Sequence, residues 1–337
     1  MRSIDLQVDV TGAAGLGEPA HVALTVTVPD ESRPDPVVCF AKPGAGYGRG
    51  YYTVDLPGPA HGAQAEWHAE RGWVFVSLDH LGVGDSSQHA SERLSYTPVV
   101  AASQAAETVV LRKLAAGTLI DGLAKIERPL TIGIGQSMGG SLTVVQQGRY
   151  HGYDGIGVLG YSALHTHPPT APGTPPIVMP WVPRDTVPSD GIFTNGPALA
   201  AVDPAAAPST NAMAWGFHYD DVDPAVVQRD LGDFPARGGD VPPWGSATVP
   251  MTVALWCLAP GSVLAEAAAI RCPVLVALGE RDVVVDPRGE PRAYESASSV
   301  DLFVCPRMAH MHNFAGTREL FWRRLETWAE WVRAART

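Results

Sequence analysis

The sequence is poor in cysteine. Its 337 residues include only four cysteines, Cys39, Cys257, Cys272 and Cys305, and no two of them form a CxxC pair. This number and spacing exclude a disulfide scaffold and a cysteine-based zinc site. Cys39 and Cys305 lie inside the apolar runs "PVVCFA" and "DLFVCP", where a cysteine behaves as a small hydrophobic residue. We assign the cysteines no chemistry.

Positive charge is also scarce. Charged residues make up 18% of the chain, with 24 Lys and Arg against 35 Asp and Glu, for a formal net charge of −11. Nucleic-acid binding depends on clustered basic side chains that neutralise phosphates, so no nucleic-acid partner is expected. Hydrophobic residues, at 45%, are abundant enough for a large core. The composition indicates a globular protein.

Long apolar segments are missing as well. No uncharged apolar run reaches the 18 or more residues of a membrane span. The first residues, "MRSIDLQVDVTGAAG", carry Asp5 and Asp9 and lack the apolar stretch and cleavage site of a secretory signal. We expect a soluble, cytoplasmic protein with no membrane partner; the sequence leaves a homo-oligomer open.

Short strands alternate with helical segments along most of the chain. The first 30 residues alternate apolar and polar side chains, which predicts an antiparallel hairpin at a sheet edge. Six apolar runs follow, separated by amphipathic segments, and such runs are typical of parallel strands covered by helices on both sides. The predicted strands are 36–41, 73–78, 130–135, 155–160, 273–279 and 300–305, and the main predicted helices are 63–72, 97–117, 141–150, 261–270 and 317–335. The pattern predicts a doubly wound, mostly parallel α/β sheet.

One segment interrupts this alternation. Residues 163–260 are rich in proline and show only short helical signals, such as Asp223 and Pro224 at the start of a helix. A structureless loop of this length is improbable inside a compact domain. We therefore predict a core formed by residues 1–162 and 261–337, with residues 163–260 inserted as a cap.

A serine follows the strand predicted at 130–135. The sequence "IGIGQSMGGS" places Ser137 in a GxSxG pattern, which is typical of a sharp turn from a strand into a helix. Gly135 and Gly139 leave room for that turn because neither has a Cβ atom. The pattern predicts that Ser137 is a nucleophile at the positive end of a helix.

A serine nucleophile needs a histidine base, and that histidine needs a carboxylate to orient it. Asp282 follows a predicted strand, three residues after Gly279, and is our preferred acid. Glu280 and Asp286 lie in the same loop and stay open as alternatives. Residues 155–184, where some proteins of this kind carry the acid, contain no Asp or Glu.

The base is expected just beyond the next strand. His310 lies nearest to that strand end and is preferred, with His312 as the alternative. His165 and His167 do not form a helical metal-binding pattern such as HExxH. No metal and no cofactor is expected.

An oxyanion formed during acyl transfer needs N–H donors. We expect one from Met138, directly after the nucleophile, and one from Ala45 in the glycine-rich loop after the first parallel strand, with Gly46 as the alternative. Tyr47 in the same loop is a candidate substrate contact.

These motifs resemble those of the α/β-hydrolase superfamily over nearly the whole chain. The resemblance rests on "PGAGYGRGYY", "SLDHLGVGDSS", "GIGQSMGGS", "ALGERD" and "MAHMHNF". It implies an eight-stranded α/β-hydrolase fold with a cap and a triad of Ser137, Asp282 and His310. Pro43-Gly44 stands where many members have His-Gly, which leaves the second oxyanion donor open.

The resemblance also implies a reaction. A serine rather than an aspartate at position 137 implies an acyl-enzyme formed from an ester or thioester. The aromatic residues of the predicted cap favour a small-molecule substrate with a hydrophobic or aromatic acyl group. Acyl transfer, lactone opening and C–C bond hydrolysis use the same triad and stay open, as does a non-catalytic ligand receptor on the same fold.

Overall fold

An eight-stranded sheet organises the chain. The computed structural model describes all residues except 32, 34, 177–181, 187–212 and 337. The strand order across the sheet is β1-β2-β4-β3-β5-β6-β7-β8. The strands are β1 (Arg2–Asp9), β2 (His21–Val28), β3 (Val37–Lys42), β4 (Val74–Leu78), β5 (Leu130–Gln136), β6 (Gly155–Leu159), β7 (Val274–Arg281) and β8 (Val300–Ala309).

Each apolar run singled out in the sequence is a strand of this sheet. β1 pairs antiparallel with β2 at one edge, and β2 pairs antiparallel with β4, so the predicted hairpin is confirmed. All pairs from β4 through β3, β5, β6 and β7 to β8 are parallel. The carboxyl ends of these parallel strands therefore meet at one end of the sheet, where open α/β sheets form their ligand sites.

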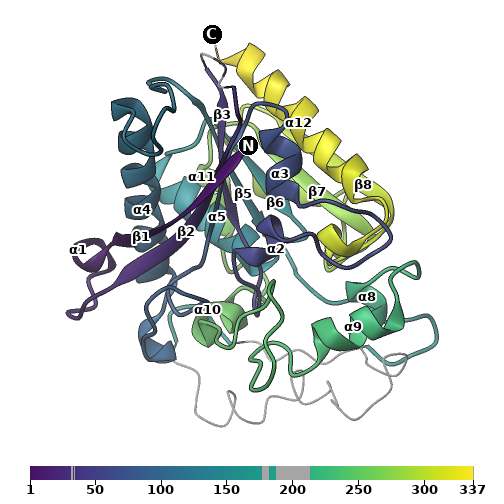
Figure 1. The fold of residues 1–337 in the computed structure, drawn as a ribbon. Coiled ribbons are helices and arrows are strands. Elements are labelled where there is room, and N and C mark those ends of the chain that lie inside the picture. The colour runs from purple at the N-terminus through teal and green to yellow at the C-terminus, as the bar shows by residue number, and fades with distance from the viewer. Residues whose placement is uncertain (32, 34, 177–181, 187–212, 337) are drawn as a thin grey trace.

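Helices cover both faces of the sheet, as Figure 1 shows. α4 (Tyr96–Ala116), α5 (Met138–Tyr150) and α11 (Leu264–Ala269) pack on one face; α3 (Gln64–Ala69) and α12 (Arg318–Ala335) pack on the other. β3 shows why both faces of its run are apolar: Val38 and Phe40 join one core cluster, while Cys39 and Ala41 join the other. Successive side chains of a strand point to opposite faces, so a doubly covered strand has no polar face.

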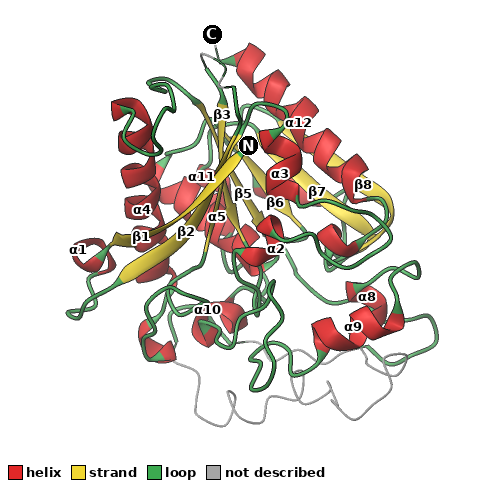
Figure 2. Cartoon of the chain, viewed as in Figure 1, coloured by secondary structure: helices red, strands yellow, loops and turns green. Residues whose placement is uncertain are grey.

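Shorter helices lie mainly in the connections. They are α1 (Thr11–Ala14), α2 (Gly50–Thr53), α8 (Ala214–Phe217), α9 (Pro224–Leu231) and α10 (Met251–Trp256), with 3₁₀ turns at Ser91–Arg93, Glu290–Ala293 and His312–Phe314. α8, α9 and α10 belong to the segment predicted as a cap, and Figure 2 shows them gathered at one end of the sheet. The predicted cap helix start is confirmed: the Asp223 side chain accepts from the N–H of Ala225, and Pro224 opens α9. The cap limits 163 and 260 stay predictions.

In the part of the chain that the structure describes, no helix combines the length and the apolar character that crossing a bilayer requires.

Candidate active site

Ser137 lies on a tight turn between β5 and α5. Its backbone has φ 55° and ψ −122°, a conformation that L-residues rarely adopt. The turn is held by the N–H of Ser137, which donates to the carbonyl of Leu159 on the neighbouring strand at 2.8 Å. A Cβ atom at Gly135 would collide with the backbone of Gly139, and one at Gly139 would collide with the backbone of Lys42. The two glycines thus permit the strained turn that projects Ser137 from the strand end.

Asp282 and His310 form a buried hydrogen-bonded pair. Asp282 directly follows β7 and His310 directly follows β8, and the two strands are parallel neighbours. The Nδ1–H of His310 donates to Asp282 Oδ1 at 2.7 Å, and both side chains are buried. The backbone N–H groups of Gly279 and Val283 donate to the same carboxylate at 2.8 and 2.7 Å. Burial by itself would raise the pKa of Asp282, but the two imidazoles beside it lower that pKa below its usual value.

The other two carboxylates of this loop point elsewhere. Glu280 accepts from the N–H of Arg307 at 2.8 Å and from the hydroxyl of Tyr219 at 2.8 Å. Asp286 accepts from the N–H of Gly289 at 3.1 Å. Of the three candidate acids, the structure places Asp282 against an imidazole.

Both candidate histidines contact Asp282. His312 lies in the turn after β8, and its Nε2–H donates to Asp282 Oδ2 at 2.8 Å. Only His310 also lines a cavity together with Ser137. The two histidines therefore differ in position. His310 contacts Asp282 Oδ1 and reaches the cavity that contains Ser137, whereas His312 contacts the other oxygen, Oδ2, and does not line that cavity.

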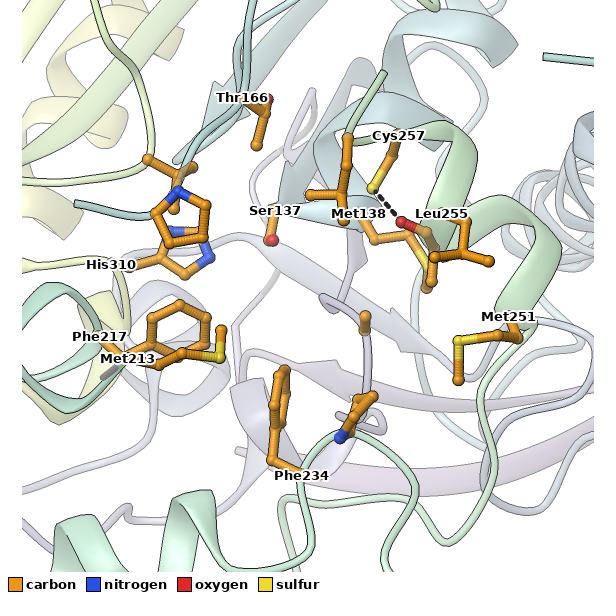
Figure 3. A pocket seen from close by; sticks show the side chains of 16 residues that line it. Ser137, Met138, Thr166, Met213, Phe217, Phe234, Met251, Leu255, Cys257 and His310 are labelled. Atoms are coloured by element: carbon orange, nitrogen blue, oxygen red, sulfur yellow. Dashed lines mark hydrogen bonds between the residues drawn. The ribbon is translucent and has the colours of Figure 1, made fainter. Parts of the chain in front are cut away.

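Ser137 and His310 face the same cavity in Figure 3. No hydrogen bond joins the Ser137 hydroxyl to an imidazole among the described residues; instead the Gln136 amide nitrogen lies 3.3 Å from His310 Nε2 and donates to the His310 carbonyl at 3.1 Å. Catalytic hydrogen bonds are often long without substrate and tighten when it binds. Sequence reasoning missed Gln136, although its place next to Ser137 on β5 is a signal that could have found it.

The expected oxyanion donors lie beside the serine. Met138 is the first residue of α5, so its N–H has no acceptor within the helix. Met138 and Ala45 both line the cavity with Ser137. Gly46 adopts φ 77°, and its carbonyl accepts from the N–H of Ser246 at 3.0 Å and from Arg237. Gly46 does not line the described cavity, so of the two candidate loop donors Ala45 is the one that shares the cavity with Ser137.

Tyr47 lies where the sequence did not place it. Its side chain is buried, and its hydroxyl donates to Asp230 Oδ2 at 2.7 Å rather than facing the cavity. The same buried carboxylate accepts from His218 Nε2 at 2.8 Å and Trp244 Nε1 at 2.7 Å, with Arg237 3.7 Å away. Burial and the nearby Asp230 charge raise the pKa of Tyr47 well above its usual value, so the hydroxyl keeps its proton. Tyr47 ties the loop after β3 to the segment that carries α8 and α9.

Replacing Tyr47 by phenylalanine should therefore affect stability more than substrate binding. A hydrogen bond to a charged group contributes about 1.5–3 kcal/mol, so the free energy of unfolding in urea should fall by about that amount. The KM of a good substrate should stay unchanged. Tyr150→Phe, at an exposed tyrosine, is the matched control. A raised KM with unaltered stability would mean that the Tyr47 hydroxyl meets the substrate after all.

The cavity that contains Ser137 is small and almost wholly apolar. Its volume is about 80 Å³, and among the described residues no acidic, lysine or arginine side chain lines it. The lining residues are Ala45, Ser137, Met138, Thr166, Pro168, Met213, Phe217, Phe234, Pro235, Met251, Ala254, Leu255, Cys257, Leu258, Val283 and His310. Sequence reasoning missed most of them, because methionine and leucine lie in any core and carry no site signal.

Few of the aromatic residues expected around the substrate line this cavity. Phe217 and Phe234 do, and the ring centroid of Phe217 lies 4.8 Å from that of His310. The other aromatic residues of the predicted cap that the structure describes pack elsewhere: Trp215 and Tyr219 against Arg281, Trp244 on Asp230, and Trp256 against Tyr96. Tyr51 and Tyr52, after the glycine-rich loop, belong to the core. Trp181 and Phe193 lie outside the described residues. Nor do the described residues contain a His, Cys, Asp or Glu cluster that could hold a metal ion.

Comparisons with known proteins identify the architecture. No protein-family model matches the sequence, and no curated protein matches it. Solved structures do: the proline iminopeptidase of Mycobacterium smegmatis is 17% identical, aligns over 99% of this chain and 100% of its own, and has a TM-score of 0.58. The bromoperoxidase of Bacillus anthracis is 14% identical over 97% and 100% of the two chains, with a TM-score of 0.60.

A third similar structure carries the name of the fold. The peroxisomal α/β-hydrolase of Saccharomyces cerevisiae is 11% identical, aligns over 98% of this chain and 88% of its own, and has a TM-score of 0.56. With eight strands in this order and a serine on the turn after β5, the chain has the α/β-hydrolase fold.

Proposed function

We propose that the protein is a serine hydrolase that cleaves an ester or thioester with a hydrophobic acyl group, through an acyl-enzyme on Ser137. One observation carries this proposal: Ser137 and His310 line the same apolar cavity, and His310 is held by the buried carboxylate of Asp282 at 2.7 Å. A strained serine, a paired imidazole and an apolar pocket are the parts that acyl transfer to a hydroxyl needs.

The residues divide the chemistry between them. His310 Nε2 takes the Ser137 proton while the serine oxygen attacks the acyl carbon, and the N–H groups of Met138 and Ala45 stabilise the oxyanion. The bond from the acyl carbon to the leaving oxygen or sulfur then breaks, and His310 returns the proton to the leaving group. A water molecule then gives a proton to His310 while its oxygen attacks the acyl carbon. The bond from that carbon to Ser137 Oγ breaks, the acid leaves, and His310 returns the proton to Ser137 Oγ. Asp282 stabilises the protonated imidazole in both halves.

The cavity supports an uncharged acyl group. Its described lining is almost wholly apolar, which suits a hydrophobic acyl chain. An ionised group buried among these side chains would lose its hydration without gaining an opposite charge. We therefore expect neutral acyl groups to react faster than dicarboxylic or amino acyl groups.

The test is hydrolysis of p-nitrophenyl esters and acyl thioesters of graded length and aromaticity, with product analysis. The proposal expects a free acid as product and a maximum of kcat/KM at a short or medium acyl chain. Transfer of the acyl group to an added alcohol in place of water would favour an acyltransferase. Failure of every ester, together with failure of a fluorophosphonate to label the protein, would favour a ligand receptor and reject the proposal.

Leu255 should limit acyl chain length. The leaving group must lie near His310, because His310 returns its proton, so the acyl group extends away from His310. Figure 3 shows Leu255 and Met251 on that far side of Ser137, with Met213 and Phe217 on the His310 side. Leu255→Ala should shift the optimum to longer chains, raising relative kcat/KM by about fourfold for each added methylene at about 0.8 kcal/mol.

Met213→Ala serves as the matched variant on the other side. It should widen the range of accepted alcohols in a series of esters that share one acyl group, and leave acyl preference as in the wild type. If Leu255→Ala instead alters the preference for the alcohol, the leaving group lies on the Leu255 side of Ser137 and the acyl group lies on the Met213 side.

A further inference from the structure

Two imidazoles share one carboxylate in this site. Asp282 Oδ1 accepts from His310 Nδ1 at 2.7 Å, and Oδ2 accepts from His312 Nε2 at 2.8 Å. Each oxygen also accepts one backbone N–H, from Val283 and Gly279. An ionised carboxylate has about four acceptor sites, so all of them are occupied. The triad acid is thus held by four donors, of which one is a second histidine.

The structure leaves room for this arrangement at Gly160, directly after β6. A Cβ atom at Gly160 would lie 3.0 Å from His310 Nδ1, 3.1 Å from His312 Cε1 and 3.2 Å from Asp282 Oδ1. Gly160 also has φ 58°, which glycine adopts without strain. The three side chains therefore converge on one backbone position that carries no side chain.

His312 is suited to be a permanent neutral donor. Its side chain is buried, and its ring packs on Phe321 with centroids 4.4 Å apart. Its Nδ1 has no hydrogen-bond partner among the described residues, so a proton there would be unsolvated. Burial lowers the pKa of His312, and the nearby Asp282 charge opposes this only in part. Because Nε2 carries its one proton, His312 cannot itself accept the proton of Ser137 from this position.

We propose that His312 is a positioning residue for the proposed hydrolysis: its Nε2–H holds the second oxygen of Asp282 and thereby fixes the direction and the basicity of the oxygen that faces His310. Without this donor, the carboxylate can rotate, and its charge acts more strongly on His310. Rotation should lower the rate, and the stronger charge should stabilise protonated His310, so that the acid limb of the pH profile moves to higher pH.

Other ionisable groups near the pair do not duplicate this role. Tyr51 of α2 accepts from the N–H of Asn313 at 3.1 Å, and burial raises the pKa of its hydroxyl, so it stays neutral. Arg318 of α12 donates to Asp55 and to the Asn313 carbonyl at 3.0 and 2.7 Å.

On β7, the two charged neighbours of Asp282 also point away from it. Glu280 contacts Tyr219, and Arg281 contacts Asp220 at 3.0 Å. The donors that reach the Asp282 carboxylate are therefore the two imidazoles and the two backbone N–H groups.

The test compares His312→Phe, which keeps a ring against Phe321 but has no donor, with His312→Gln, whose amide N–H can donate. The inference rests on the proposed function, so kcat/KM is measured between about pH 5 and 9 on the best ester of the panel. His312→Phe should lose about tenfold or more in kcat/KM, and its acid limb should lie at higher pH. His312→Gln should recover most of the rate and the wild-type limb. If His312→Phe does not fold, His312→Leu takes its place.

Equal loss in the Phe and Gln variants with an unmoved acid limb would overturn the proposal and leave His312 a packing residue. Nitrogen-15 NMR of the wild-type imidazoles provides a readout that needs no activity. His312, assigned by its absence in the variants, should stay neutral with the proton on Nε2 between about pH 5 and 8. A proton on Nδ1 would overturn the proposal even if the wild type hydrolyses esters. If the wild type hydrolyses none, the proposed function fails, and the NMR result still decides the His312 contact.

Discussion

Ser137→Ala should abolish covalent labelling by a fluorophosphonate and lower kcat for the best ester by about 10⁴- to 10⁶-fold. The reason is that the alanine variant has no oxygen to form the acyl-enzyme, while the cavity and the oxyanion donors remain. The residual rate should come from bound water and the N–H groups of Met138 and Ala45. Labelling is followed by intact mass and ester hydrolysis by product release.

Ser141→Ala is the matched control, since Ser141 belongs to the same "QSMGGS" segment. Its hydroxyl is buried and donates to the Met138 carbonyl at 2.7 Å. The fluorophosphonate should label the Ser141→Ala variant to the same extent as the wild type. If labelling persists in Ser137→Ala and disappears in Ser141→Ala, Ser141 is the nucleophile and the proposed mechanism is rejected.

Asp282→Asn should lower kcat by about 10³- to 10⁴-fold. The asparagine amide can accept through one atom only, so one of the two imidazoles and one of the backbone N–H groups would face an NH₂ group. When that imidazole is His310, its proton moves to Nε2, and the ring can no longer take the proton of Ser137. The KM should change less than kcat, because Asp282 does not line the cavity.

The other carboxylates of the loop supply the controls. Glu280→Gln and Asp286→Asn should keep the wild-type pH profile, since their partners are Arg307, Tyr219 and Gly289 rather than a histidine. A loss in Glu280→Gln that matches the loss in Asp282→Asn would contradict the assignment of the acid.

Much of the fold could be predicted from the chain because its signals are local. Every parallel strand is a short apolar run, and the run at 36–41 became β3 within one residue at each end. The alternation of β1 follows from its place at the sheet edge, where its polar side chains are exposed, whereas β2 lies between β1 and β4 and is largely buried on both faces. Strand order could not be predicted this way: β4 lies between β2 and β3 in the sheet, and adjacency depends on which helices pack on which face.

In the candidate site, too, the sequence indicates some features and not others. Gly135 and Gly139 indicate the turn at Ser137 from the sequence alone, because a side chain at either position would collide with neighbouring backbone atoms. The pair of His310 and His312 on one acid gave no such signal, since their spacing of two residues fits a loop or a strand equally well. Tyr47 was misplaced for a related reason: an aromatic side chain beside a glycine-rich loop suits a pocket or an anchor, and the buried Asp230 that holds it lies far along the chain.

By itself the sequence determined the layers of the molecule, the serine on its strained turn and the set of acids and bases within reach of it, because each depends on residue types at short separations. Only the tertiary structure decided which imidazole faces the serine, which carboxylate serves both histidines and which apolar side chains enclose the cavity. Those choices arise from contacts between segments far apart in the chain, such as that between Gln136 and His310, which are 174 residues apart. No local pattern encodes the direction in which a side chain points across such a distance.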